Sequence, residues 1–357
     1  SYVTNMDFSQ GIKANLNAPF RIIYSREARK KIRVVLDDFQ PDVVHLNNIQ
    51  YHLTPSIILE INKWRKETKK ECKIVYTTHD YQLVCPSHGM FDVNMKPCER
   101  CLDGHYIHCL QTKCLKNSRA KSLLGTLDGY MWKYSKAYSY VDAYICCSFF
   151  LKSKLDTQKR FRDKTIGLHN FKKEMPHLDN IQKKGYVLEF GHLSRDKGTD
   201  TLLEVAKKMP NTEFVFIGYG PSADKMKDIP NVKYLGFKTG EELYRIIAEA
   251  AISVCPSEWY ENCPYSVMES VLLGTPVVGS KMGGIPELIE PGKTGELFEA
   301  GNVEDLMKAI KKVLQTQDVL ERYTKNCSQV KYETTESYYI KLMKIYRGEK
   351  NVEQISS

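Results

Sequence analysis

The stretch that decides the fold lies between residues 257 and 270 and reads Ser257-Glu258-Trp259-Tyr260-Glu261-Asn262-Cys263-Pro264-Tyr265-Ser266-Val267-Met268-Glu269-Ser270. It follows an apolar run and opens a helical segment, in which Pro264 suits the first turn and Asn262 or Cys263 suits the cap. The unpaired N–H groups at such a helix end attract anions, and the helix dipole adds to the attraction. Glu269 lies further along this helix and leans back toward its N-terminus. A carboxylate there is expected when the anionic ligand also carries a sugar diol, and Glu261 is placed to hold a second sugar.

Alternating strands and helices extend outward from this stretch in both directions. The chain has 357 residues, enough for two domains of about 150 residues each. The later series is predicted to have strands at 186–190, 213–217, 232–236, 252–255 and 276–278, and helices at 200–209, 241–250, 264–273 and 303–314. The earlier series is predicted to have strands at 42–46, 73–78 and 143–147, and helices at 26–39, 55–64 and 117–140. Both series predict doubly wound parallel sheets, with ligands at the carboxyl ends of the strands. The polar stretch 172–184 is the expected linker.

Two further loops follow strands of the later series. The first, Gly191-His192-Leu193-Ser194-Arg195-Asp196-Lys197-Gly198, places basic residues between a strand and a helix, where a diphosphate would be neutralised. The second, Gly283-Gly284-Ile285-Pro286-Glu287, has glycines that allow a backbone to approach a ligand closely.

Taken together, these motifs resemble the retaining glycosyltransferases of family 4, which have the GT-B fold of two Rossmann-like domains facing across a cleft. The family's two glutamates eight residues apart match Glu261 and Glu269. Its other donor-side motifs match 274–278, 283–287 and 292–295. In the earlier series, Pro41-Asp42-Val43-Val44-His45 and Thr78-His79-Asp80-Tyr81 resemble the family's histidine-bearing segments.

The resemblance implies an acceptor-side domain at 1–171, a donor domain at 185–330 and a final helix at 333–347 that packs back on the first domain. It implies that Glu269 holds the donor ribose, that Glu261 holds the sugar or its phosphates, and that Lys197 neutralises the leaving diphosphate. Phe237 would flank the base, and His79 would lie near the anomeric carbon. The catalytic residues would be His79, Lys197 and Glu261. The donor-binding residues would be Gly191, His192, Arg195, Lys197, Phe237, Glu261, Asn262, Cys263, Pro264, Tyr265 and Glu269. Such enzymes need no metal or other cofactor for catalysis.

Two departures from the family pattern are visible. His192 stands where the family usually has an arginine, so Arg195 or His192 itself is expected to take over its role. The segment before Asp42 is shorter than the family's and lacks its Gly-Gly loop, which leads us to expect an incomplete N-terminal domain, as in an N-terminally truncated chain.

A cysteine-rich insert at 85–114 interrupts the earlier series. The Cys-x-x-Cys pair Cys98 and Cys101, with Cys109 and Cys114, resembles a structural zinc knuckle, and Cys85 is an alternative ligand. A cluster of free thiols that packs the loop explains the pattern equally well.

The charge distribution bears on the partners. The chain carries a formal charge of +9, and residues 113–164 alone hold twelve basic against four acidic residues, interleaved with aromatics. This segment suits an anionic lipid surface, although a solvated helix face with buried aromatics fits equally well. The sequence shows neither a membrane-length apolar run nor the order of a signal peptide. We therefore expect a cytoplasmic enzyme, able to bind at the inner face of the membrane, that transfers a hexose from a nucleotide diphosphate sugar to a lipid-linked or polysaccharide-precursor acceptor. A nucleotide-sugar epimerase is the rival enzyme. A zinc-bearing nucleic-acid-binding module is disfavoured, because binding nucleic acid requires no ribose carboxylate in a glycine-rich crevice.

Overall fold

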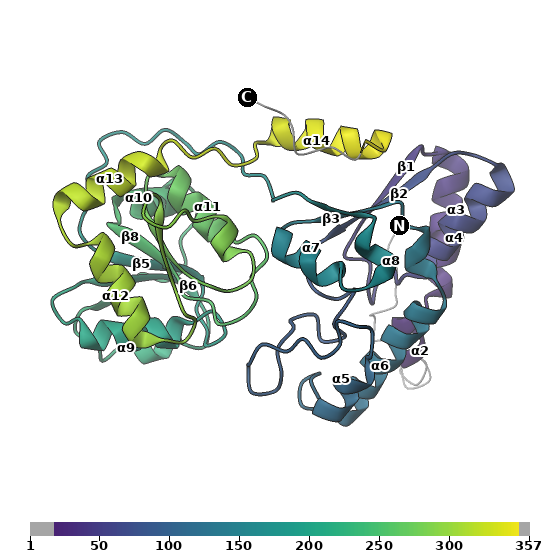
Figure 1. Cartoon of the computed structure of the whole chain (residues 1–357), viewed down its shortest axis with the longest axis horizontal. Coiled ribbons are helices and arrows are strands. Elements are labelled where there is room, and N and C mark those ends of the chain that lie inside the picture. The colour runs from purple at the N-terminus through teal and green to yellow at the C-terminus, as the bar shows by residue number, and fades with distance from the viewer. Residues whose placement is uncertain (1–17, 350–357) are drawn as a thin grey trace. The chain divides into compact units, whose positions relative to one another are not determined.

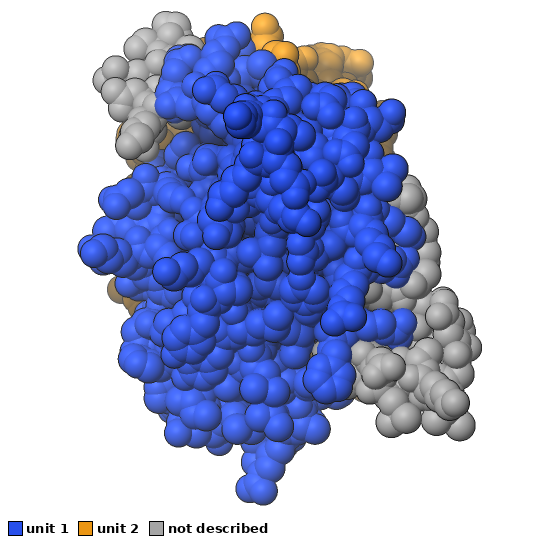
Figure 2. Space-filling model, turned by 90° about the vertical axis from the view of Figure 1, so that its right-hand side faces the viewer, with its two compact units in different colours: residues 1–94, 98–168, 340–357 blue, residues 95–97, 169–339 orange. Residues whose placement is uncertain are grey.

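The computed structural model describes residues 18–349. Within this range the chain forms two compact units, which Figure 2 shows in different colours. Unit 1 comprises residues 18–94, 98–168 and 340–349, and unit 2 comprises residues 95–97 and 169–339. Each unit is built around its own parallel sheet, as the alternating pattern predicts.

Unit 2 contains a six-stranded parallel sheet in the order β10-β9-β8-β5-β6-β7. Its helices cover both faces of the sheet (Figure 1). Alternate residues of β5 enter two different apolar cores, with Val187 on the side of α9 and α12 and Leu188 on the side of α10. The strands are β5 (Val187–His192), β6 (Phe214–Tyr219), β7 (Val232–Tyr234), β8 (Ile252–Cys255), β9 (Val277–Ser280) and β10 (Gly295–Phe298). The helices are α9 (Thr199–Lys208), η2 (Ala223–Met226), α10 (Gly240–Glu249), α11 (Tyr265–Leu272), η3 (Ile285–Glu287), α12 (Val303–Val313) and α13 (Gln317–Cys327).

Unit 1 contains a four-stranded parallel sheet in the order β1-β2-β3-β4. The cysteine-rich insert, residues 85–114, follows β2, and the long helix α6 comes after it. The strands are β1 (Val43–Asn47), β2 (Lys73–Thr78), β3 (Ala143–Cys146) and β4 (Thr165–Gly167). The helices are α2 (Ala18–Ile23), α3 (Arg26–Phe39), α4 (Ser56–Thr68), α5 (Ile107–Thr112), α6 (Arg119–Tyr134), η1 (Ala137–Tyr140), α7 (Phe149–Leu155) and α8 (Lys159–Arg162).

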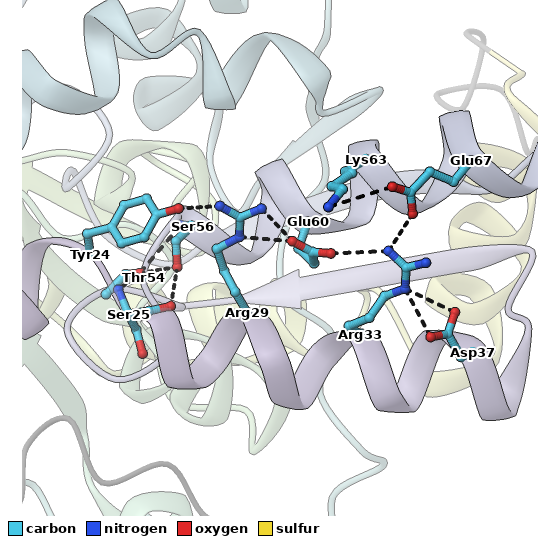
Figure 3. A network of polar contacts seen from close by, with 10 residues as sticks. All are labelled: Tyr24, Ser25, Arg29, Arg33, Asp37, Thr54, Ser56, Glu60, Lys63 and Glu67. Atoms are coloured by element: carbon cyan, nitrogen blue, oxygen red, sulfur yellow. Dashed lines mark hydrogen bonds and ion pairs between the residues drawn. The ribbon is translucent and has the colours of Figure 1, made fainter.

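A polar network joins α3 to α4 in unit 1 (Figure 3). The Glu60 carboxylate, only 7% exposed as a residue, accepts hydrogen bonds from Arg29 Nε at 2.9 Å and Arg33 Nη1 at 3.3 Å. Arg33 also pairs with the exposed Glu67 at 2.6 Å. Because a buried carboxylate is stable only when paired, these two arginines fix how α3 lies on α4.

The final helix α14 (Thr335–Arg347) is divided between the two units after Tyr339. In its first part, the Tyr338 ring lies 4.8 Å from the ring of Phe171, both in unit 2. In its last turns, the Tyr346 hydroxyl lies 2.7 Å from Nδ1 of His45 in unit 1. Tyr339, the last residue of α14 that groups with unit 2, is 59% exposed.

Candidate active site

A pocket of about 280 Å³ opens at the carboxyl ends of β5 and β8 in unit 2. The sheet order changes direction at this point, because the chain runs outward from β5 to β7 and then returns to the other side of β5 with β8. Such a switch leaves a crevice between neighbouring strand ends, where ligands of doubly wound sheets bind. The pocket is lined by Glu189, Phe190, Gly191, His192, Lys197, Val254, Cys255, Pro256, Ser257, Glu261, Pro264, Ser266 and Glu269.

An ion pair between Lys197 and Glu261 crosses this pocket. Lys197 Nζ lies 2.5 Å from Glu261 Oε1, and the two side chains are 27% and 16% exposed. Ser257 Oγ donates a second hydrogen bond to the same carboxylate oxygen at 3.2 Å, and Lys197 lies 4.4 Å from the centre of the Trp259 ring. The pair therefore offers a positioned cation for phosphate oxygens and a positioned carboxylate for sugar hydroxyls.

The second carboxylate, Glu269, has a partner that the sequence analysis did not predict. Lys172, in the segment expected to be a linker, forms an ion pair with Glu269, and both side chains are largely buried. Lys172 also lies 5.4 Å from the centre of the Tyr265 ring, and its backbone N–H donates to the carbonyl of Glu333. Unit 2 already begins at His169, and this segment is fastened to it. No local pattern signals the pair, because 97 residues separate its members.

Helix α11 begins at Tyr265, one residue later than predicted, and its N-cap residue is not one of the two that were predicted. Pro264 is the N-cap residue, with φ −68° and ψ 120°, and no side chain caps the helix. The prediction that Asn262 or Cys263 caps it is wrong. Cys263 is buried, with its Sγ 3.8 Å from Met268 Sδ, so it belongs to the core and does not line the pocket. Because Pro264 and Ser266 both line the pocket, the positive end of the α11 dipole lies beside it, where it favours an anion.

The glycine turn at 283–284 shapes the loop that carries Glu261. Gly283 has φ +61°, and a Cβ there would lie 2.0 Å from the carbonyl oxygen of Glu261. The N–H of Gly284 donates to that same oxygen at 2.7 Å. The sequence analysis predicted that these glycines allow close approach to a ligand, but the partner they approach is the backbone of Glu261.

Three aromatic rings form a row beside the pocket. The ring of Tyr219, at the end of β6, lies 5.4 Å from His192 and 5.9 Å from Phe237. Tyr219 and Phe237 are 62% and 65% exposed, so their faces are available to a planar ligand such as a nucleobase. The sequence analysis found Phe237 and His192 but missed Tyr219. A large aromatic residue directly after a buried strand was the available signal.

The other predicted donor residues do not line the pocket. Arg195 is exposed on the loop before α9 and does not line the pocket, so its role in place of the family's arginine stays a prediction. Asn262 and Tyr265 flank Pro264 without lining the pocket, and Tyr265 is 45% exposed.

Unit 1 places three histidines near the carboxyl ends of β1 and β2. His79 Nε2 lies 2.9 Å from Asn47 Oδ1, and burial lowers the pKa of His79, although the nearby Asp80 opposes the shift. His45 lies 2.7 Å from Thr77 Oγ1, and burial lowers its pKa as well. His88 Nε2 lies 2.7 Å from the Tyr51 hydroxyl, and burial again lowers the pKa. These histidines are therefore neutral at pH 7 and present hydrogen-bonding groups without charge.

The cysteines of the insert surround one small cavity of about 10 Å³, which Cys85, Cys98, Cys101, Cys109 and Cys114 all line. Cys114 Sγ lies 2.9 Å from Cys109 Sγ, and this hydrogen bond lowers the pKa of Cys114 to about 7. Burial and the neighbouring thiols raise the pKa of Cys101 to about 12. Among residues 18–349, no three cysteine, histidine or carboxylate side chains are arranged as a metal-binding group. The thiols are thus gathered as a zinc site requires, but without the geometry of ligands.

Comparison with known proteins finds similarity that is concentrated in unit 2. Residues 170–330 match the family model described as "Glycosyl transferases group 1". The chain is 33% identical over 146 residues to the sulfoquinovosyl transferase SQD2 of Arabidopsis thaliana, which covers 39% of this chain and 28% of that protein. It is 30% identical over 166 residues to the amylovoran biosynthesis glycosyltransferase AmsK of Erwinia amylovora, which covers 42% and 41%. A further match, an uncharacterized 42.6 kDa protein of the Klebsiella pneumoniae cps region, is 23% identical. The matches span between 28% and 64% of the length of these three relatives.

Solved structures extend the likeness to both units. The Anabaena protein Alr3699/HepE in complex with UDP and glucose aligns with a TM-score of 0.62 at 16% identity, over 89% of this chain and 81% of that one. The sucrose-phosphate synthase of Thermosynechococcus elongatus aligns with a TM-score of 0.63 at 17% identity, over 90% and 76%. Two α/β units with parallel sheets and these neighbours show the GT-B fold, and within it residues 170–330 of unit 2 are similar to the group 1 glycosyl transferases.

Proposed function

We propose that this protein is a retaining glycosyltransferase that transfers a hexose from a nucleotide diphosphate sugar to a hydroxyl group of a lipid-linked or polysaccharide-precursor acceptor. The observation that carries the proposal is the pocket at β5 and β8, where Glu261 and Glu269 lie with Lys197 beside the uncapped end of α11. Carboxylates for hydroxyl groups, a cation and the positive end of a helix dipole together match a ligand that is both a polyol and an anion.

The reaction forms a bond between the acceptor oxygen and the anomeric carbon and breaks the bond from that carbon to the diphosphate. The departing diphosphate takes the bonding electrons, so negative charge grows on its oxygens in the transition state. Lys197 and the N–H groups of α11 stabilise that charge without a metal. The acceptor hydroxyl gives its proton to an oxygen of the departing diphosphate, and we assign neutral His79 to hydrogen-bond the acceptor.

The class of nucleotide is supported by the relatives. The Anabaena protein forms complexes with UDP and glucose and with UDP-glucose. AmsK is named for the biosynthesis of a polysaccharide, amylovoran. We therefore propose a UDP-sugar or a GDP-sugar as the donor and a precursor of a polysaccharide as the acceptor.

A stripe of exposed apolar residues on α6 supports a lipid-linked acceptor. Leu123, Leu127, Met131 and Tyr134 are 44%, 50%, 37% and 72% exposed, and their spacing places them along one face of the helix. The stripe lies in the basic stretch 113–164. Apolar side chains among basic ones suit the surface of an anionic membrane. Among the helices of residues 18–349, none is long and apolar enough to cross a membrane.

The test starts with thermal shift against UDP, GDP and their sugars, with a DNA oligonucleotide as the negative control. We expect one nucleotide family to raise the melting temperature. A transfer assay with that sugar follows, and NMR of the product should show the same anomeric configuration as the donor. Protection by oligonucleotides alone would contradict the proposal, and so would epimerisation of the free nucleotide sugar without transfer.

Sedimentation with vesicles tests the acceptor side. We expect the protein to bind vesicles that contain phosphatidylglycerol and not vesicles of phosphatidylcholine alone. Leu127→Asp should weaken this binding, whereas Val93→Asp, at another exposed apolar position of unit 1, should leave it unchanged. Equal binding of both variants would argue against a membrane role for α6.

A further inference from the structure

Glu189 is a buried carboxyl group in the middle of strand β5. It is only 4% exposed, and its side chain lies on the face of the sheet whose core contains Val187, Leu202 and Phe216. An ionised carboxylate at such a position would be costly unless several partners held it. The group is therefore expected to have either strong partners or no charge.

The partners of Glu189 satisfy only one of its two oxygens. Thr199, the first residue of α9, donates its hydroxyl hydrogen to Oε1 at 2.7 Å. Oε2 is enclosed and has no hydrogen-bond partner anywhere in the part of the chain that the structure describes. A buried oxygen without a partner in a native fold calls for an explanation, and a bound ligand is one.

The groups that face Glu189 do not supply a cation of its own. Asp200 on α9 is an acid, held by Lys225 and Ser222. On β8 the neighbour is Cys255, a buried thiol whose pKa is raised to about 12, and Lys197 and Glu261, beyond that thiol, are paired with each other. Burial raises the pKa of Glu189 to about 8, the Thr199 hydrogen bond opposes the shift, and Asp200 adds to it. At pH 7 Glu189 is thus mostly a carboxylic acid, with an O–H group to donate.

The direction in which that O–H can donate is set by the pocket. Glu189 lines the pocket together with Gly191, Lys197 and Glu261. The enclosed Oε2 has no hydrogen-bond partner among the described residues, so a hydrogen bond from it to a ligand would replace none. We infer that Glu189 is a further donor-binding residue, which acts as a neutral carboxylic acid and donates a hydrogen bond to a diphosphate oxygen of the nucleotide sugar.

This inference rests on the proposed function and adds a property that the other pocket residues do not give. A neutral acid attracts a phosphate oxygen, whereas the same group in its ionised form repels it. Donor binding therefore requires the proton on Glu189. Once most of the protein has lost that proton, above about pH 8, each further pH unit removes about nine tenths of the binding-competent form.

The experiment measures the dissociation constant of whichever of UDP and GDP protects the wild type, by calorimetry from pH 7 to 9.5. We expect the wild-type affinity to be nearly flat to about pH 8 and then to fall toward tenfold per pH unit. Glu189→Gln keeps a hydrogen-bond donor that cannot ionise. It should bind within about threefold of the wild type at pH 7 and show no fall at higher pH. Glu189→Ala should bind at least tenfold more weakly at pH 7, again without the fall.

Glu258→Gln is the matched control, because Glu258 also accepts a threonine hydroxyl, from Thr201, but does not line the pocket. It should keep the wild-type pH profile, and circular dichroism should show that every variant is folded. A Glu189→Gln variant with the wild-type profile, or one that binds more tightly than the wild type at pH 7, would overturn the inference. Absence of wild-type binding to either nucleotide would instead overturn the proposed function. Loss of binding in Glu269→Ala, with both Glu189 variants unaffected, would overturn the inference alone.

Discussion

The two units carry different chemistry at the same place in their sheets. In unit 2, the carboxyl ends of β5 and β8 carry a charged pair, Lys197 and Glu261. In unit 1, His45 within β1 and His79 directly after β2 are kept neutral by burial and bond to Thr77 and Asn47. One topology thus supports a site suited to an anion and another suited to uncharged hydroxyl groups. The sheet thus fixes where a site lies, whereas the residues after each strand determine what the site binds.

The largest effect, a loss of kcat, should come from replacing Lys197, the cation of the pocket in unit 2. Lys197→Ala should lower kcat about 100-fold to 1000-fold, because it removes a charge that stabilises the leaving diphosphate. Steady-state kinetics with the identified donor measures this change. Lys207→Ala, at an exposed lysine of α9 paired with Glu204, is the control and should behave as the wild type. A rise in KM with kcat unchanged would mean that Lys197 binds the ground state and the transition state equally.

Glu269→Ala should have the next largest effect and should act on affinity. Leaving the ribose hydroxyls without their acceptor costs about 1–3 kcal/mol, or roughly 5-fold to 150-fold in the dissociation constant of the nucleotide. Calorimetry measures this loss. Glu249→Ala is a suitable control, because Glu249 is also a largely buried carboxylate paired with a lysine, Lys184. Unchanged nucleotide affinity in folded Glu269→Ala would exclude the ribose role.

Glu60→Ala tests whether unit 1 can be destabilised without affecting the pocket in unit 2. Glu60→Ala leaves Arg29 and Arg33 without their shared partner, and because both arginines are partly exposed we expect a loss of about 2 kcal/mol. Thermal unfolding should show a transition lowered by a few degrees. Protection by the nucleotide should persist. Glu67→Ala removes the exposed partner of the same Arg33 and should leave the melting temperature unchanged. Equal losses of melting temperature in Glu60→Ala and Glu67→Ala would show that the burial of Glu60 does not determine how much this network stabilises unit 1.

His79 should have a smaller effect, with a distinctive pH dependence. His79→Ala removes one hydrogen bond to the acceptor and should lower kcat about tenfold without changing nucleotide affinity. Because burial holds the pKa of His79 below its usual 6.5, the neutral form persists to lower pH. Activity should therefore fall only as the pH drops below 6.5, and the variant should lack this fall. His105→Ala, at an exposed histidine of the same unit, should keep the wild-type profile. A full pH dependence in His79→Ala would assign the titration to another group.

The smallest effect is expected from the cysteine insert. If the thiols around the small cavity hold zinc, metal analysis of protein prepared without chelators should give one zinc per chain. Removal of the metal should then lower the melting temperature by a few degrees. The replacement Cys98→Ser or Cys101→Ser should release the metal, whereas Cys327→Ser, at a buried cysteine of unit 2, should not. Protein without zinc would leave the insert packed by free thiols.

The sequence predicts much of the fold because strand ends and glycine turns are local signals. The strands 73–78 and 252–255 have the predicted bounds, and six predicted donor residues line one pocket. The strands β4 and β10 were not predicted, since β4 is Thr-Ile-Gly with one large apolar residue and β10 begins within the glycine motif 292–295. The ion pair of Lys172 with Glu269 was not predicted, because two residues far apart in the sequence leave no periodic pattern. Glu189 was read as part of an apolar strand, and only its burial and its unpaired oxygen reveal it.

The turn at Gly283 has a consequence for how mutations of this protein will be read. A side chain at this position would strike the carbonyl oxygen of Glu261 and displace the carboxylate that its loop presents. In a screen of random variants, substitutions of Gly283 would therefore be counted among donor-site mutants, although the residue has no side chain with which to touch a ligand. Position 283 should tolerate less sequence drift than exposed positions nearer the pocket, because its tolerance is set by a neighbouring backbone and not by the substrate.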